Sequence, residues 1–182
     1  MKKSLIAAVV LASASFASTA AMAATVGNTP QVLDLTDGSG FFGDTFAMNN
    51  NGNTFADRFT FSVAGAGMSL DAIISSVSHS ADTGLDITGL SLYNATGDAL
   101  VSSGASLQSG NIDVWTISGD NLAAGNYYLQ VNGNLVSDQA ASFGGAVAMA
   151  APVPEPETYG MMLAGLGVLG FLARRRKSAN QA

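Results

Sequence analysis

Between residue 24 and residue 151 the chain alternates short apolar runs with turn-forming residues. In the segment Phe55–Val63 the apolar side chains of Phe55, Phe59, Phe61 and Val63 share one face with a period of two, which is typical of a strand with one buried face. No helical pattern in this region is longer than two turns. Further strands are predicted at 84–93, 111–118 and 125–132, with an Asn132-Gly133 turn after the last, and weaker ones at 31–35, 44–48, 69–77, 99–102 and 142–148. This pattern predicts an all-β domain, an antiparallel β-sandwich of about seven to nine strands.

The first 23 residues have the pattern of a secretory signal helix. Lys2 and Lys3 form a positive start, an apolar run of residues 5–12 follows, and Ala21 and Ala23 supply a small-x-small cleavage site. An N-terminal membrane anchor is the alternative, but this apolar run is short against the roughly 20 residues that span a bilayer. We therefore expect the translocase and signal peptidase as partners and a mature chain that starts at Ala24.

The C-terminal end has three parts in a fixed order. A rigid acidic segment, Val153-Pro154-Glu155-Pro156, precedes an uncharged apolar stretch, and a basic cluster follows it at once: Arg174, Arg175, Arg176 and Lys177. The apolar stretch lacks the polar face of a helix that packs on a soluble domain. We expect a single transmembrane helix over 159–173, with the basic cluster in the cytoplasm and the β domain outside.

This three-part tail resembles the PEP-CTERM sorting signal of Gram-negative bacteria. The resemblance implies that exosortase, a membrane protease-transpeptidase, recognises and cleaves the chain near Pro154-Glu155-Pro156. It also implies export through the inner membrane to the cell surface or extracellular matrix, in association with extracellular polysaccharide such as biofilm material.

Two further resemblances concern the β domain. The segment Phe55-Ala-Asp57-Arg-Phe59 is similar to the F-x-D-x-F signature of a family of PEP-CTERM proteins. The order of the segments at 57–61, 90–93 and 124–131 is similar to pre-peptidase C-terminal domains, which implies a jelly-roll-like sandwich.

Charge is divided unevenly along the chain, whose net charge is −6. From residue 24 to residue 153 there are eleven Asp, no Glu, no Lys and a single Arg, Arg58. Phosphate backbones would repel such an acidic domain, so nucleic acid is excluded as a partner. The chain has no Cys and one His, His79, so disulfides, thiolate metal sites and multi-histidine centres are excluded and no cofactor is expected.

Few residues of the β domain suggest chemistry of their own. His79 has no Gly-x-Ser-x-Gly elbow to complete a hydrolase triad, so we expect an ordinary surface histidine. Asp34 and Asp37 are weak calcium candidates that turn formation explains equally well. Asp57 interrupts an apolar face, either as a ligand or as a carboxylate bonded to backbone N–H groups or to Arg58. Because Arg58 points to the opposite face, we expect a backbone partner for Asp57. Trp115 and the Tyr127-Tyr128 pair either stack on sugar rings or, as we expect, pack in the core.

The sequence thus predicts an exported, non-enzymatic protein of the cell surface or matrix. A carbohydrate- or calcium-binding module is the first alternative, and a secreted hydrolase is the second. The expected organisation is a signal peptide at 1–23, a β-sandwich domain at 24–151, a sorting motif and linker at 152–158, a transmembrane helix at 159–173 and a basic tail at 174–182.

Overall fold

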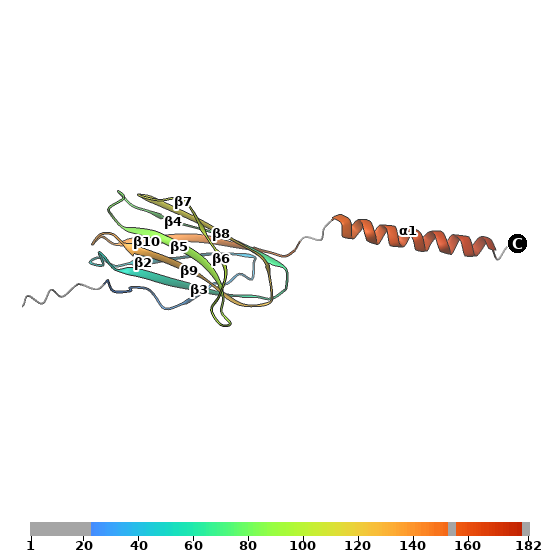
Figure 1. Ribbon diagram of the computed structural model, residues 1–182, viewed down its shortest axis with the longest axis horizontal. Helices are drawn as coiled ribbons and strands as arrows, with labels where there is room; N and C mark the ends of the chain where they lie inside the picture. The colour runs from blue at the N-terminus through green and yellow to red at the C-terminus, as the bar shows by residue number, and fades with distance from the viewer. Residues whose placement is uncertain (1–22, 153–155, 180–182) are drawn as a thin grey trace, which may run out of the picture.

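The structure, a computed structural model, describes residues 23–152 and 156–179. This part of the chain is mostly strand and ends in a single helix (Figure 1). Its elements are β1 (Gln31–Val32), β2 (Ser39–Phe46), β3 (Thr54–Val63), β4 (Met68–Val77), β5 (Leu85–Asn94), β6 (Ala99–Ser103), β7 (Ala105–Gln108), β8 (Ile112–Leu122), β9 (Gly125–Leu135), β10 (Ala141–Ala150) and α1 (Pro156–Ala179).

The strands form two sheets of five. One has the order β1-β3-β9-β5-β6 and the other the order β2-β10-β4-β8-β7. All neighbours are antiparallel except β1 and β3, which run parallel. From β2 to β5, and again from β8 to β10, each strand lies in the sheet opposite to the strand before it. The chain therefore crosses repeatedly from one sheet to the other, and the buried side chains of both sheets form one core.

An aromatic cluster fills the space between the sheets. Phe55 and Phe59 of β3 are buried and face Phe42, Phe46 and Phe143 from the other sheet, with ring centroids 4.6–6.1 Å apart. Along β3 the side chains from Phe55 to Val63 are buried at every second position, which confirms the predicted period of two. Large aromatic side chains supply much of the apolar area that holds such a core together.

Three details differ from the sequence-based expectations. The predicted strand at 44–48 is instead β2 at Ser39–Phe46, and the short edge strand β7 was not predicted. The predicted turn at Asn132-Gly133 is wrong, because β9 continues through both residues to Leu135. Gly133 lies opposite Phe55, and a Cβ on Gly133 would come within 2.3 Å of the Phe55 ring. This glycine makes room for an aromatic ring and does not turn the chain.

The C-terminal segment also needs a correction. A helix is present there, but among the described residues no helix is long and apolar enough to cross a membrane, so the predicted transmembrane helix over 159–173 is not supported. The physical reason is the short uncharged stretch between Glu157 and Arg174. Its sixteen residues, 158–173, span only about 24 Å as a helix.

Several predicted features lie outside the described residues. These are residues 1–22 of the predicted signal peptide, including Ala21, and the sorting-motif residues Val153, Pro154 and Glu155. Ala23 is the first described residue, and Pro156 is the first residue of α1.

Candidate functional site

Helix α1 has favourable residues at both ends. Pro156 stands at its first position, where the missing N–H costs nothing, and Glu157 lies in the first turn. The basic residues Arg174–Lys177 lie toward the C-terminal end. Acidic groups near the start and basic groups near the end of a helix both interact favourably with its dipole. The predicted cleavage segment therefore immediately precedes a well-bounded helix.

The apolar side chains of α1 are exposed around its circumference. Three of them, Met161, Met162 and Leu163, are consecutive and hence point in three directions. In Figure 1 the helix lies beyond the end of the β domain and not against either sheet. At least half of each side chain is exposed for Tyr159, Met161, Met162, Leu163, Leu166, Val168, Leu169 and Phe171. An apolar surface of this kind marks a site of interaction with a protein or a membrane.

A second candidate site is a pair of buried carboxylates. Asp57 lies on β3 between Phe55 and Phe59, and Asp44 lies on β2 between Phe42 and Phe46. The exposed fractions of Asp57 and Asp44 are only 2% and 8%. Because the two strands belong to opposite sheets, the carboxylates meet across the core near its edge.

The N-terminal segment covers this pair. Asn28 donates its backbone N–H to Asp57 Oδ1 at 2.9 Å and its side-chain N–H to Asp44 Oδ1. Asp44 Oδ1 also accepts the N–H of Thr45 at 2.7 Å. Gly27 lies so close that a Cβ there would be 2.9 Å from Asp57 Oδ1. The segment is held in place at its start, where the Val26 N–H donates to the Thr54 carbonyl at 2.7 Å.

The second oxygen of each carboxylate has no such support. Asp44 Oδ2 and Asp57 Oδ2 are both buried without a hydrogen-bond partner among the described residues. Burial raises the pKa of Asp57 to about 6, and the neighbouring Asp44 carboxyl adds to this effect. Arg58 cannot neutralise the pair, because its guanidinium lies 4.7 Å from the Tyr128 ring centroid and donates to Gln130 Oε1.

Sequence reasoning singled out Asp57 but missed both Asp44 and Asn28. It expected a backbone N–H as the partner of Asp57 and Arg58 on the opposite face, and the structure has both. An Asp at the centre of an F-x-D-x-F pattern in β2, Phe42-Gly-Asp44-Thr-Phe46, was the signal that could have identified Asp44.

The weak calcium candidates lie elsewhere. Asp34 Oδ1 accepts hydrogen bonds from the N–H and the hydroxyl of Thr36, which is an Asx turn. These bonds lower the pKa of Asp34. Among residues 23–152 and 156–179 no three His, Asp or Glu side chains converge on one metal position.

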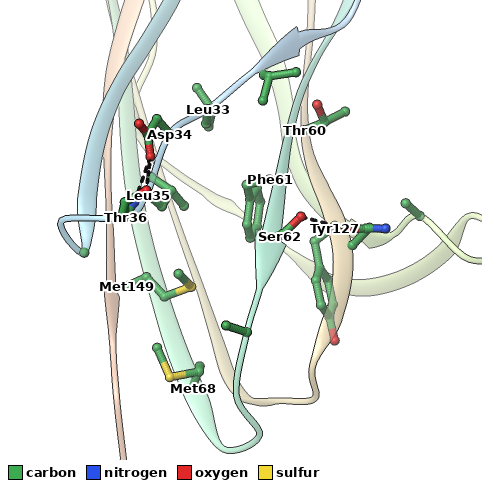
Figure 2. A pocket seen from close by; sticks show the side chains of 15 residues that line it. Leu33, Asp34, Leu35, Thr36, Thr60, Phe61, Ser62, Met68, Tyr127 and Met149 are labelled. Atoms are coloured by element: carbon green, nitrogen blue, oxygen red, sulfur yellow. Dashed lines mark hydrogen bonds between the residues drawn. The ribbon is translucent and has the colours of Figure 1, made fainter.

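Beside this turn lies a pocket of about 930 Å³ (Figure 2). Leu33, Leu35, Phe61, Met68, Tyr127 and Met149 give it an apolar lining. Among the described residues that line it, only Asp34 carries a charge at neutral pH. The cavity could hold an apolar group, but it offers no pair of acid and base.

The other candidates have structural surroundings. His79 is exposed, and the neighbouring Ser80 Oγ pairs with Thr83 Oγ1 at 3.3 Å. The Trp115 indole N–H donates to the Ile87 carbonyl at 3.0 Å, and its ring packs against the core. Tyr127 and Tyr128 are buried, with 3% and 4% of their surfaces exposed. Sugar stacking on these rings has no support, since stacking requires an exposed face.

Two solved structures are similar to about 70% of the chain, and a family model matches its C-terminal tail. The chain is similar to the crystal structure of Aeromonas hydrophila PliG, a periplasmic lysozyme inhibitor of g-type lysozyme. The two sequences are 15% identical and the TM-score is 0.43; the alignment covers 70% of this chain and 100% of PliG. It is also similar to the pre-peptidase C-terminal domain of collagenase from Bacillus anthracis, at 15% identity and a TM-score of 0.33, covering 71% and 95%. No curated protein matches.

A family model matches the tail itself. The model is that of the PEP-CTERM protein-sorting motif, and it covers residues 152–177, which include α1 up to Lys177. The match agrees with the order found in the sequence, in which a Pro-Glu-Pro segment, an apolar helix and a basic cluster follow one another. The chain therefore carries a PEP-CTERM protein-sorting motif at its C-terminal end, which implies exosortase as its processing partner.

Proposed function

We propose that this chain is an exported, non-enzymatic protein of the cell surface or extracellular matrix, sorted and cleaved by exosortase and associated with exopolysaccharide in a biofilm. The observation that carries the proposal is the sorting motif at residues 152–177. Its helix has exposed apolar side chains, and a strongly acidic domain with a single Arg precedes it. The tail would direct delivery, and the β domain would be the delivered cargo.

The properties of the tail support a role in delivery. The exposed apolar helix would hold the chain at the inner membrane, and the basic residues after it would be attracted to anionic lipid headgroups. In the sequence, the predicted cleavage segment Pro154-Glu155-Pro156 leads directly into this helix. Signal peptidase would remove residues 1–23 at the other end.

The β domain has features suited to life outside the cell. The alternation of strands between two sheets supports a jelly-roll-like module at 24–151, which buries its apolar side chains without any disulfide. Its acidic surface would keep the domain soluble. The proposal of a non-enzymatic role rests on the sequence, which has no Gly-x-Ser-x-Gly motif that would activate a serine for His79.

The test replaces Pro154, Glu155 and Pro156 together by Ala in the producing bacterium. The mass and location of the product are then followed in cytoplasmic, membrane and external fractions. We expect the parent chain to reach the cell surface or medium without its tail, and the triple variant to stay cell-associated with the tail attached.

A matched control replaces Ser178, Asn180 and Gln181 by Ala. These residues lie beyond the matched motif, so the control should be processed and exported like the parent chain. If the Pro154-Glu155-Pro156 variant is processed and exported normally as well, the sorting proposal is wrong.

A further inference from the structure

The carboxylate pair lacks a countercharge. Asp44 Oδ2 and Asp57 Oδ2 are buried with no hydrogen-bond partner in the part of the chain that the structure describes, whereas both Oδ1 atoms accept hydrogen bonds from the backbone or from Asn28. The two carboxyls are neighbours, since Asn28 donates hydrogen bonds to both of them. Two like charges held together away from water are strongly unfavourable unless something neutralises them.

The chain offers no cation for this purpose within its β domain. Arg58 is the only Lys or Arg from 24 to 153, and it lies over Tyr128 on the outer face of its sheet. A proton or a metal ion from solution must therefore neutralise the pair.

We propose that Asp44 and Asp57 bind a hard divalent cation, Ca²⁺, between their Oδ2 atoms. Asn28 would supply a third ligand, because rotation of its amide about χ2 exchanges the positions of its nitrogen and oxygen. Ca²⁺ accepts carboxylate, amide and water oxygens at about 2.3–2.6 Å in irregular arrangements, whereas Mg²⁺ requires nearly ideal octahedral geometry. Since only two acidic side chains meet here, water would complete the shell.

The position of the carboxylate pair at the edge of the core would let an ion reach it from solution and stabilise the folded state. Asp44 lies on an edge strand, β2. The segment covering the pair, residues 24–28, is attached to β3 by one isolated bridge at Thr25 and Thr54 and by the hydrogen bond from the Asn28 N–H to Asp57. An ion bound there would connect this segment to both sheets. Binding to the folded state alone raises its stability in proportion to the logarithm of ligand concentration.

The experiment uses the full chain in a neutral detergent, which shields the exposed residues of α1. After removal of metal with EDTA, CaCl₂ is titrated by calorimetry at pH 7.5, and the melting temperature is measured with about 1 mM CaCl₂ and with EDTA. MgCl₂ is titrated in parallel. The variants Asp57→Asn and Asp44→Asn test the site, and Asp34→Asn, in the surface Asx turn, is the matched control.

We expect one Ca²⁺ per chain, a rise in melting temperature of about 5 °C or more, and at least about tenfold weaker Mg²⁺ binding. Asp57→Asn and Asp44→Asn should abolish both the heat and the rise, while Asp34→Asn should keep them. If either site variant fails to fold, the titration of the parent chain decides alone.

Other outcomes overturn the proposal. An unchanged melting temperature with no calorimetric heat in the parent chain would show that a shared proton neutralises the pair. Full Ca²⁺ binding by Asp57→Asn would place the ion elsewhere, and equally tight Mg²⁺ would overturn the assignment to Ca²⁺. None of these results affects sorting, which the tail variants test separately.

Discussion

The contact between Gly133 and Phe55 predicts a large effect from a single methyl group. In Gly133→Ala the new Cβ would lie 2.3 Å from Phe55 Cζ and 2.4 Å from the Asp86 carbonyl oxygen. Both distances are far below van der Waals contact. The Phe55 ring is held by neighbours, since its centroid lies 4.6 Å from that of Phe46 and 5.6 Å from that of Phe143. The ring therefore has no free space into which to move.

The magnitude follows from known costs of overpacking. Inserting a methylene into a filled core costs about 1–3 kcal/mol, and here a backbone oxygen is in the way as well. We expect Gly133→Ala to lower the free energy of unfolding by at least about 2 kcal/mol. For a domain of this size that corresponds to a drop in melting temperature of roughly 6–10 °C.

The assay is urea unfolding of the full chain, followed by the fluorescence of Trp115, the only tryptophan. Gly144→Ala is the matched control, because Gly144 also lies in a strand and its Cβ would meet nothing within 4 Å. That variant should be neutral or stabilising by up to about 1 kcal/mol.

A double variant tests the mechanism. In a Phe55→Leu background the ring is gone but the Asp86 oxygen remains, so the cost of Gly133→Ala should fall by about 1 kcal/mol without vanishing. If Gly133→Ala is as stable as the parent chain, the packing of Phe55 over this glycine is refuted.

Three further predictions can be checked by the same unfolding assay. The Ile87 N–H donates a hydrogen bond to the buried Asp113 carboxylate at 3.0 Å. Asp113→Ala removes this acceptor and should lower the free energy of unfolding by about 2–4 kcal/mol; a loss near zero would contradict this bond. In EDTA the pKa of Asp57 is raised to about 6, so between pH 4 and pH 6 the folded state retains a proton that the unfolded chain releases. The protonated carboxyl therefore adds roughly 3 kcal/mol to the free energy of unfolding below pH 4, and this addition is lost as the pH rises to about 6. The decline should be absent in Asp57→Asn. Arg58→Ala should cost about 0.5–1 kcal/mol by uncovering the ring beneath it, and no loss would mean that this contact is negligible.

Local patterns made much of the fold predictable. The alternation from Phe55 to Val63 identified β3 and its buried face because side-chain direction in a strand depends only on neighbouring residues. The tail was equally readable, since a Pro-Glu-Pro segment, an apolar stretch and a basic cluster are all contiguous in the sequence.

Features that depend on distant contacts were not predictable. Asn132-Gly133 has the composition of a hairpin turn, and only the packing of Phe55 from a neighbouring strand explains a glycine inside β9. The pairing of Asp57 with Asp44 likewise depends on which sheet each strand joins. An isolated Asp on an apolar face shows that a partner is needed, but the sequence does not say which residue provides it.

The intact mass of the protein recovered from the surface or medium of the producing cells tests the central claim most directly. Delivery by the tail predicts a species that begins at Ala24 and ends near Pro154-Glu155-Pro156, so that α1 and the basic cluster are missing. Recovery of the complete 182-residue chain from the cytosol, with both ends retained and no shorter species outside, would contradict it.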